Sequence, residues 1–303
     1  MLNTTEPVVL SHPESAPAAE SLAAALGCAC RAIDLHRFPD GESRVTLPTE
    51  LSTRVILYRS LDRPNPKLIE LLLTIRGLRA RGVQHITLVA PYLCYMRQDC
   101  AFEPGDVISQ QVIGEFMAQH VDTLISVDPH LHRVSTLTEA MPCPQAMSLS
   151  AAPLFRDYLD QHHRGAVLLG PDAESAQWVA SIAGDAYPFA VAQKHRHGDR
   201  EVHIELPPLE LRDQTVVLID DVISTGQTLL KTVEALHQQQ VRGIIILVTH
   251  ALFADEDFDQ ALYASGVTEI ISTDSIPHRS NRLALAPLLA AALTRLRDTQ
   301  IRS

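Results

Sequence analysis

Short, uninterrupted runs of aliphatic residues recur along this 303-residue chain in two series. Runs without polar alternation are typical of strands buried on both faces, as in a parallel sheet. Amphipathic helical segments separate most of the runs, which favours an α/β fold. The first series is "VVL" (8–10), "VILY" (55–58), "ITLVA" (86–90) and "TLISV" (123–127), and the second is "VLLG" (167–170), "VVLI" (216–219), "IIILV" (244–248) and "EIIST" (269–273).

The two series match each other in order, which indicates an internal duplication. "VVLSHPESA" (8–16) resembles "VLLGPDAESA" (167–176), and "VQHITLVAPYL" (83–93) resembles "VRGIIILVTHAL" (241–252). Chance similarity between aliphatic strands is the alternative, but it does not easily explain a matched order. We therefore expect two copies of one α/β domain, 1–146 and 147–303, each a mainly parallel sheet flanked by helices.

The first copy is longer than the second after "VAPYL". The offset between matching segments falls from 158 residues (83 to 241) to 146 residues (121 to 267), a difference of 12. Ligands of open α/β sheets bind at the carboxyl ends of the strands. An insertion at such a strand end therefore points to function.

Composition narrows the partners and the compartment. The formal net charge of −11 argues against a nucleic-acid partner. Five cysteines without a C-x-x-C pair are typical of reduced thiols, so we expect a cytoplasmic protein. The N-terminus lacks a signal-peptide pattern, and the most apolar stretch, "LALAPLLAAAL" (283–293), is too short to span a bilayer. We therefore expect no membrane association.

The stretch "VVLIDDVISTGQT" (216–228) combines a buried strand, an acidic pair and a small hydroxyl-rich loop that leads into a helix. Backbone amides and hydroxyls at a helix N-terminus suit a phosphate monoester. The lysine of a P-loop is missing. Asp220 and Asp221 would repel a phosphate unless they face sugar hydroxyls or a magnesium ion, so the pattern suits a phosphorylated sugar. An ordinary N-capped helix beside a stray acidic pair is the alternative.

This stretch resembles the phosphoribosyl-pyrophosphate (PRPP) motif of type I phosphoribosyltransferases and PRPP synthetases. Other segments resemble the PRPP synthetases, or ribose-phosphate diphosphokinases, in order from about residue 36 to 275. A phosphoribosyltransferase would normally carry one such domain rather than two. The further segments are "FPDGESRV" (38–45), "PYLCYMRQD" (91–99), "VDPH" (127–130), "GPDAES" (170–175) and "KHR" (194–196).

The resemblance implies that the chain transfers the diphosphoryl group of ATP to the 1-hydroxyl of ribose 5-phosphate, giving PRPP and AMP. It also implies Mg²⁺ as the cofactor and a homodimer or larger assembly, because the adenine-binding loop reaches in from a neighbouring subunit. The implied site residues are Lys194 and Arg196 for catalysis, Phe38, Asp40, Glu42, Arg97, Gln98 and Asp99 for ATP, Asp220, Asp221, Ser224, Thr225, Gly226, Gln227 and Thr228 for ribose 5-phosphate, and His130 and Asp172 for the metal.

The segment "AVAQKHRHGDREVHIEL" (190–206) is predicted to form a hairpin flap. Hydrophobic residues alternate with polar ones from 202 to 206, and Gly198-Asp199 supplies a turn. Lys194 and Arg196 are two residues apart, so both are expected on one face of a strand. Two cations on a flap can stabilise the charge of a transferring group. A solvated charged hairpin is the alternative.

Some positions depart from the family pattern. The segment "CAFEPGDVIS" (100–109) is closer to the archaeal-type branch, which is associated with weak or absent allosteric control. Gln227 stands where glycine is usual, which predicts a slightly altered loop, and Pro129 stands where leucine is usual. Two rival functions stay open: a phosphoribosyltransferase that uses PRPP, and an inactive regulatory relative. Zinc at "DPHLH" is a weaker idea, since no Cys or His pair at zinc spacing accompanies it.

Overall fold

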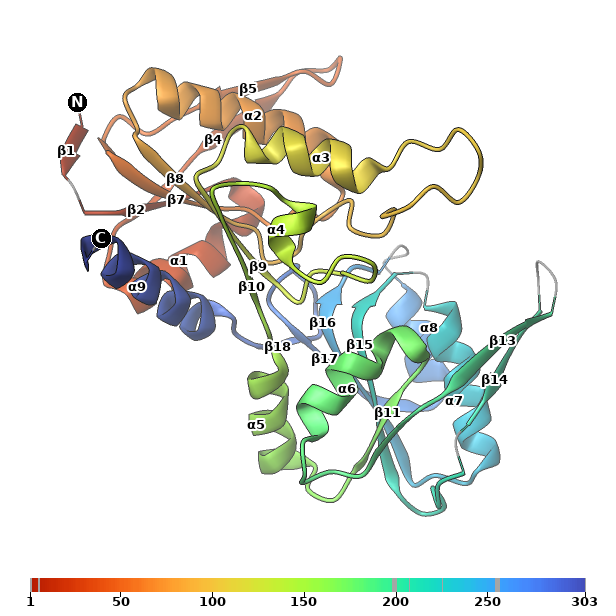
Figure 1. The fold of residues 1–303 in the computed structure, drawn as a ribbon. Helices are drawn as coiled ribbons and strands as arrows, with labels where there is room; N and C mark the ends of the chain where they lie inside the picture. The colour runs from red at the N-terminus through yellow and green to blue at the C-terminus, as the bar shows by residue number, and fades with distance from the viewer. Residues whose placement is uncertain are drawn as a thin grey trace. The chain divides into compact units, whose positions relative to one another are not determined.

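A computed structural model describes residues 2–4, 6–197, 201–206, 208–224, 226–253 and 257–302. The chain divides into two compact units (Figure 1). Unit 1 consists of Met1–Leu149, Ser275–Pro277 and Ala284–Ser303. Unit 2 consists of Ser150–Asp274 and His278–Leu283. Each unit is built around its own six-stranded parallel sheet.

The strands of unit 1 form one large sheet and two small pairs. In chain order they are β1 (Leu2–Thr4), β2 (Val8–Ser11), β3 (Cys30–Ala32), β4 (Asp34–Arg37), β5 (Ser43–Thr46), β6 (Leu51–Ser52), β7 (Arg54–Tyr58), β8 (His85–Val89), β9 (Thr123–Val127) and β10 (Gln145–Leu149). The large sheet has the order β3-β2-β7-β8-β9-β10. All residues of β2 and β9 are buried, as expected for strands covered on both faces. The hairpin β4–β5 follows the edge strand β3.

Helices cover both faces of the sheet in unit 1. They are η1 (Pro13–Ser15), α1 (Ala16–Leu26), α2 (Pro64–Ala80), α3 (Ser109–Ala118), α4 (Leu137–Ala140) and α9 (Ala286–Arg302). Helices α1 and α9 lie on one face, and α2 and α3 lie on the other (Figure 1). The chain runs from β2 to β3 in one direction and from β7 to β9 in the other. Right-handed crossovers therefore put α1 on the face opposite α2 and α3.

Unit 2 repeats this plan. Its strands are β11 (Val167–Gly170), β12 (Phe189–Val191), β13 (Gln193–His197), β14 (Glu201–Glu205), β15 (Thr215–Ile223), β16 (Gly243–Ala251), β17 (Val267–Thr273) and β18 (Asn281–Leu283). Its helices are α5 (Ala152–His162), η2 (Ala173–Ser175), α6 (Ala176–Ala183), α7 (Gln227–Gln238) and α8 (Phe258–Ala264). The parallel sheet has the order β12-β11-β15-β16-β17-β18, and the antiparallel hairpin β13–β14 follows the edge strand β12.

The two sheets correspond strand for strand, from β3 and β12 at one edge to β10 and β18 at the other. Each unit also has its own cluster of buried aliphatic side chains. The predicted fold class, two parallel-sheet α/β domains flanked by helices, is confirmed.

The C-terminal segment differs from the predicted domain division. The sequence analysis assigned every residue from 147 onward to the second domain, whereas Ala284–Ser303 belongs to unit 1. The physical reason is that α9 packs against α1. Among the described residues, no helix is both long enough and apolar enough to cross a membrane.

Candidate active site

The acidic pair of unit 2 lies within β15. The sequence predicts that the strand stops at Ile219, but β15 continues to Ile223. It continues because Val222 and Ile223 remain paired with β16 and are themselves buried. Asp221 is 2% exposed, and its backbone amide donates to Oδ1 of Asp220 over 3.0 Å.

Asp172 lies at the same edge of the sheet as this pair. It follows β11, which is the direct neighbour of β15. Its Oδ1 caps η2 by accepting a hydrogen bond of 3.1 Å from the amide of Glu174. Burial, together with the negative charges of Asp221 and Asp172, raises the pKa of Asp220 well above its usual range. Three carboxylates that repel one another in this way suit a cation or hydroxyl donors.

The predicted phosphate loop leads from β15 into α7. Gly226 is the N-cap residue of α7 and has a φ of 66°. A Cβ atom there would lie 1.8 Å from Cε1 of Phe258, so the position requires glycine. Gly226 makes no side-chain capping hydrogen bond to α7, and the amides at a helix N-terminus bind anions. Ser224 is half-buried, and Thr225 lies outside the described residues.

Gln227 is the first residue of α7, is exposed, and does not have a positive φ. A glutamine in place of glycine therefore adds no backbone strain at this residue. The expected alteration of the loop stays a prediction. Thr228 follows in the first turn of α7, and its carbonyl accepts a 2.8 Å hydrogen bond from Thr232.

The predicted hairpin around Lys194 and Arg196 is present as β13–β14. In the register, Lys194 pairs with Ile204 and Arg196 pairs with Val202. Ile204 is buried. The predicted turn at 198–199 and the side chains of Lys194 and Arg196 lie outside the described part of the structure.

In unit 1, the segment Arg97-Gln98-Asp99 follows β8. Oε1 of Gln98 accepts a 2.7 Å hydrogen bond from the amide of Ser109, at the start of α3. The carboxylate of Asp99 is 1% exposed and is bound by the guanidinium of Arg133. Arg97 is exposed and has no hydrogen bond or ion pair with any residue that the structure describes. Gln98 and Asp99 thus hold the loop, whereas Arg97 is available to an anion.

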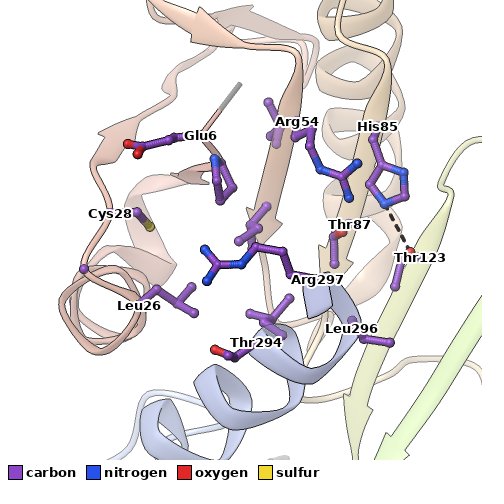
Figure 2. A pocket seen from close by; sticks show the side chains of 15 residues that line it. Glu6, Leu26, Cys28, Arg54, His85, Thr87, Thr123, Thr294, Leu296 and Arg297 are labelled. Atoms are coloured by element: carbon purple, nitrogen blue, oxygen red, sulfur yellow. Dashed lines mark hydrogen bonds between the residues drawn. The ribbon is translucent and has the colours of Figure 1, made fainter. Parts of the chain in front are cut away.

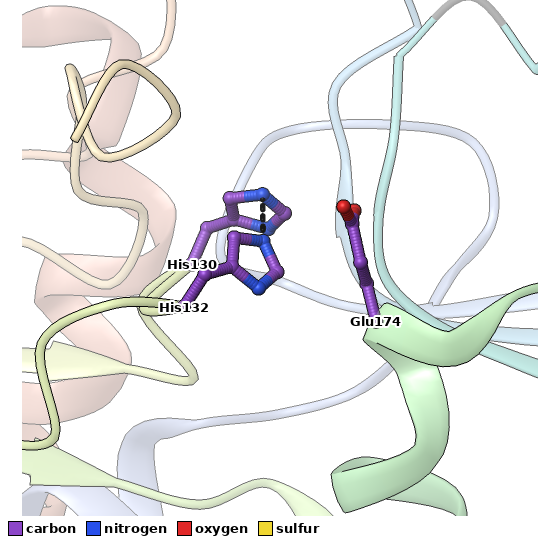
Figure 3. A group of neighbouring side chains, drawn as sticks. All are labelled: His130, His132 and Glu174. Atoms are coloured by element: carbon purple, nitrogen blue, oxygen red, sulfur yellow. Dashed lines mark hydrogen bonds between the residues drawn. The ribbon is translucent and has the colours of Figure 1, made fainter. Parts of the chain in front are cut away.

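His130 follows β9 and lies beside His132 (Figure 3). Their Nε2 atoms are 2.5 Å apart, and their ring centroids are 4.0 Å apart. One imidazole must donate and the other accept in such a contact. The sequence analysis considered His132 only within the weaker zinc idea at "DPHLH" and did not select it as a metal ligand. The spacing H-x-H in a segment after a strand end was the available signal.

Phe38, Asp40 and Glu42 lie at the exposed tip of the hairpin β4–β5. The amide of Phe38 donates to the carbonyl of Glu42 over 2.8 Å, and the amide of Glu42 donates to Oδ1 of Asp40 over 3.1 Å. The ring of Phe38 contacts His36 edge-on at 4.7 Å between centroids. The tip is therefore a tight turn that presents an aromatic side chain, and Asp40 stabilises the turn itself.

A buried charge cluster in unit 1 was missed by the sequence analysis. Arg59 directly follows β7, and its side chain is fully buried. It forms ion pairs with Glu14 and with Glu70, and Lys67 forms an ion pair with Asp62 nearby. The signal was present as an arginine at the end of the run "VILY" and as polar residues spaced three and four apart on α2, namely Lys67, Glu70 and Thr74.

A cavity of about 460 Å³ lies elsewhere in unit 1 (Figure 2). Its walls include Arg54, His85 and Thr123, which begin β7, β8 and β9, together with Arg297 of α9. It therefore lies at the amino ends of the strands, whereas Arg97 and His130 follow the carboxyl ends. None of the predicted site residues lines this cavity.

Comparison with known proteins gives concordant matches over both units. A family model described as the N-terminal domain of ribose phosphate pyrophosphokinase matches residues 8–120, and a phosphoribosyl transferase domain model matches residues 148–281. The ribose-phosphate pyrophosphokinase of Methanopyrus kandleri is 34% identical over 295 residues, covering 95% of this chain and 99% of the relative. That of Methanosarcina acetivorans is 30% identical over 291 residues, covering 95% and 99%.

A solved structure agrees with the fold. The phosphoribosylpyrophosphate synthetase from Mycobacterium smegmatis superimposes with a TM-score of 0.82 at 23% sequence identity, covering 97% of this chain and 100% of that one.

Proposed function

The chain belongs to the ribose-phosphate pyrophosphokinase family, and from this premise we propose that it transfers the diphosphoryl group of ATP to ribose 5-phosphate. The oxygen of the sugar 1-hydroxyl forms a bond to the β-phosphorus of ATP. The bond between that phosphorus and the oxygen bridging it to the α-phosphorus breaks. AMP leaves, PRPP forms, and the hydroxyl proton is released.

Unit 2 supplies the sugar-phosphate site in this proposal. The amides at the start of α7, with Ser224, Thr225 and Thr228, bind the 5-phosphate. Asp220 and Asp221 accept hydrogen bonds from the ribose hydroxyls. The observation that carries the proposal is this pairing of a negative strand end with an anion-binding helix start in one strand–loop–helix unit.

The carboxylates of unit 2 fit a magnesium ion. Mg²⁺ prefers oxygen ligands, and burial together with the charges of Asp221 and Asp172 raises the pKa of Asp220, which supports a cation beside this cluster. In this proposal Asp172 would hold the ion in unit 2. The other residue to which the family resemblance assigns a metal is His130, in unit 1. When bound, the ion neutralises charge on the transferring phosphoryl groups.

To catalyse phosphoryl transfer, the protein must also position the two substrates and stabilise the charge on the transferring group. Lys194 and Arg196 on the hairpin β13–β14 stabilise the charge that develops on the transferring group. Arg97 binds the phosphates of ATP. Gln98 and Asp99, which the sequence analysis also assigned to ATP, support this residue through their contacts with α3 and Arg133.

The exposed tip of β4–β5 provides the adenine contact in this proposal, with Phe38 as the stacking surface and Asp40 and Glu42 beside it. This tip serves a neighbouring subunit, so the active form is a homodimer or a larger assembly. The compartment that we propose is the cytoplasm, where the five cysteines, all free thiols, stay reduced.

An assay of AMP release tests the activity. We expect AMP from ATP only when ribose 5-phosphate and Mg²⁺ are both present, with PRPP formed in equal amount. If a nucleobase were instead consumed with PRPP and no AMP appeared, the chain would be a phosphoribosyltransferase. If neither reaction occurred while ATP still bound, it would be an inactive relative.

The exposed loop 101–107 bears on how the enzyme is regulated. The loop contains Glu103 and Asp106 but no Lys or Arg. The carboxylate of Asp106 accepts hydrogen bonds from the backbone amides of Phe102 and Glu103. An anionic effector needs donors, and carboxylates repel it. We expect initial rates to be independent of added phosphate, and ADP to inhibit by competition with ATP. Phosphate activation, or ADP inhibition that persists at saturating ATP, would contradict this expectation.

A further inference from the structure

One buried carboxylate holds the hairpin β4–β5 directly below its tip. Arg37 and Ser43 face each other across the hairpin and form the last residue pair before the turn at 38–42. Nε of Arg37 donates to Oε1 of Glu70 over 2.9 Å, and the hydroxyl of Ser43 donates to the same oxygen over 3.1 Å. A single oxygen atom of Glu70, on α2, therefore binds one side chain from each strand of the hairpin.

Glu70 is itself firmly held. Its side chain is 1% exposed, and its second oxygen, Oε2, accepts a hydrogen bond from the fully buried Arg59. Arg59 in turn donates to Glu14 over 2.9 Å and to the carbonyl of Lys67 over 3.1 Å. The carboxylate is thus fixed by α2, by the end of β7 and by η1 before it meets the hairpin.

The charge state of Glu70 suits this role. Burial by itself raises the pKa of the carboxyl, but hydrogen bonds from Arg37 and Arg59 outweigh burial, and the pKa lies below its usual value. Glu70 is therefore a carboxylate at neutral pH. Hydrogen bonds to an ionised acceptor are about twice as strong as neutral ones.

We propose that Glu70 is a positioning residue for the nucleotide, acting through Arg37 and Ser43 to fix the tip that carries Phe38. The proposal rests on the proposed function, in which this tip contacts adenine. Ordering a mobile side chain on binding costs free energy, so a ring on a tip that is already held in place binds more tightly. Because the tip contacts adenine in the proposed function, the effect concerns ATP and not the sugar phosphate.

The test removes the two hairpin side chains that bind Glu70 and leaves the Arg59–Glu70 ion pair intact. In the double variant Arg37→Ala/Ser43→Ala, we expect the KM for ATP to rise about tenfold. The kcat and the KM for ribose 5-phosphate should stay within about twofold of the wild type. The backbone amides of Phe38 and Gly41, which close the turn, should exchange hydrogen faster.

Arg44→Ala is the matched control on the same hairpin. Arg44 is exposed, and its side chain has no hydrogen bond or ion pair with any described residue. We expect it to change neither the KM for ATP nor the amide exchange. Glu70→Gln is less suitable as a first variant, because it weakens the partner of the buried Arg59 and threatens the fold.

The outcomes separate the proposal from the activity on which it rests. If the wild-type chain releases no AMP from ATP and ribose 5-phosphate, the proposed function fails. If the wild type is active but the double variant keeps its KM for ATP, or raises both KM values equally, the positioning role is wrong. A rise in the KM for ATP alone, with a melting temperature equal to that of Arg44→Ala, supports it.

Discussion

The two units share one strand order but carry opposite charges at the same place. β7 and β15 are equivalent strands, since Val55 pairs with Val8 on β2 and Val216 pairs with Val167 on β11. Four residues further along, unit 1 has Arg59 and unit 2 has Asp220. The duplication therefore kept the backbone plan and reversed the charge at the end of a central strand.

Arg59 has ion-pair partners in unit 1, whereas Asp220 in unit 2 forms no ion pair with any residue that the structure describes. Arg59 lies between Glu14 and Glu70, and nearby His12, the N-cap residue of η1, has its pKa lowered to about 3 by burial and by Arg59, so it is neutral. The equivalent N-cap residue of η2 is Asp172, which adds repulsion to Asp220. Ion pairs neutralise this position in unit 1, whereas in our proposal a ligand relieves the repulsion around Asp220 in unit 2.

The hairpins differ in a parallel way. Each follows the edge strand of its sheet, as β4–β5 after β3 and β13–β14 after β12. The first presents Phe38 at a turn held by Glu70, and the second contains Lys194 and Arg196. In our proposal, one structural position thus serves nucleotide recognition in one copy and charge stabilisation in the other.

The largest effect is expected from Arg59→Met, which breaks the neutralised cluster of unit 1. The change leaves Glu14 and Glu70 without their shared buried cation. Removing one partner of a buried ion pair costs about 3–5 kcal/mol, because an uncompensated buried charge remains. Urea unfolding should show this loss in the free energy of unfolding.

Arg31→Ala is the matched control for Arg59→Met. Arg31 and Glu50 form a salt bridge of 3.6 Å with side chains that are 47% and 69% exposed. An exposed pair contributes about 0–1 kcal/mol. If Arg59→Met cost no more than Arg31→Ala, the cluster would not be the stabilising counterpart of the acidic site in unit 2.

Lys194→Ala should have the next largest effect, and it concerns rate rather than stability. Loss of one charged contact made in the transition state commonly lowers kcat about 10²–10³-fold. The KM values should change far less. His195→Ala is the control, since the alternation of side chains along a strand places it on the opposite face. A Lys194→Ala enzyme with a normal kcat would make β13–β14 a structural hairpin only.

The duplicated fold could be predicted from sequence because parallel strands leave a local mark. Uninterrupted aliphatic runs such as 86–90 and 244–248 identify strands buried on both faces, and their repeated order identifies the copies. The phosphate loop was likewise local, since 216–228 contains strand, acids, small residues and helix start within thirteen positions. Both conclusions needed no contact between distant segments.

The features that could not be predicted depend on such contacts. Arg59 meets Glu70 only after β7 and α2 pack together, and Asp99 meets Arg133 only when the loops after β8 and β9 lie side by side. The placement of α9 in unit 1 depends on its packing against α1. Even the length of β15 was decided by its pairing with β16 beyond the acidic residues.

The smallest effect is expected from Asp220→Asn, and its sign is the sharpest test of the comparison. The change keeps the size of the side chain and the oxygen that accepts the Asp221 amide, but removes one of three repelling charges. In metal-free buffer we expect the free energy of unfolding to rise by about 1 kcal/mol while affinity for ribose 5-phosphate falls, the usual trade at a functional site. The exposed control Asp213→Asn should stay within about 0.5 kcal/mol of the wild type. If Asp220→Asn were instead destabilising by 1 kcal/mol or more, Asp220 would be satisfied within the fold as Glu70 is. Its carboxylate would then support structure rather than await a ligand.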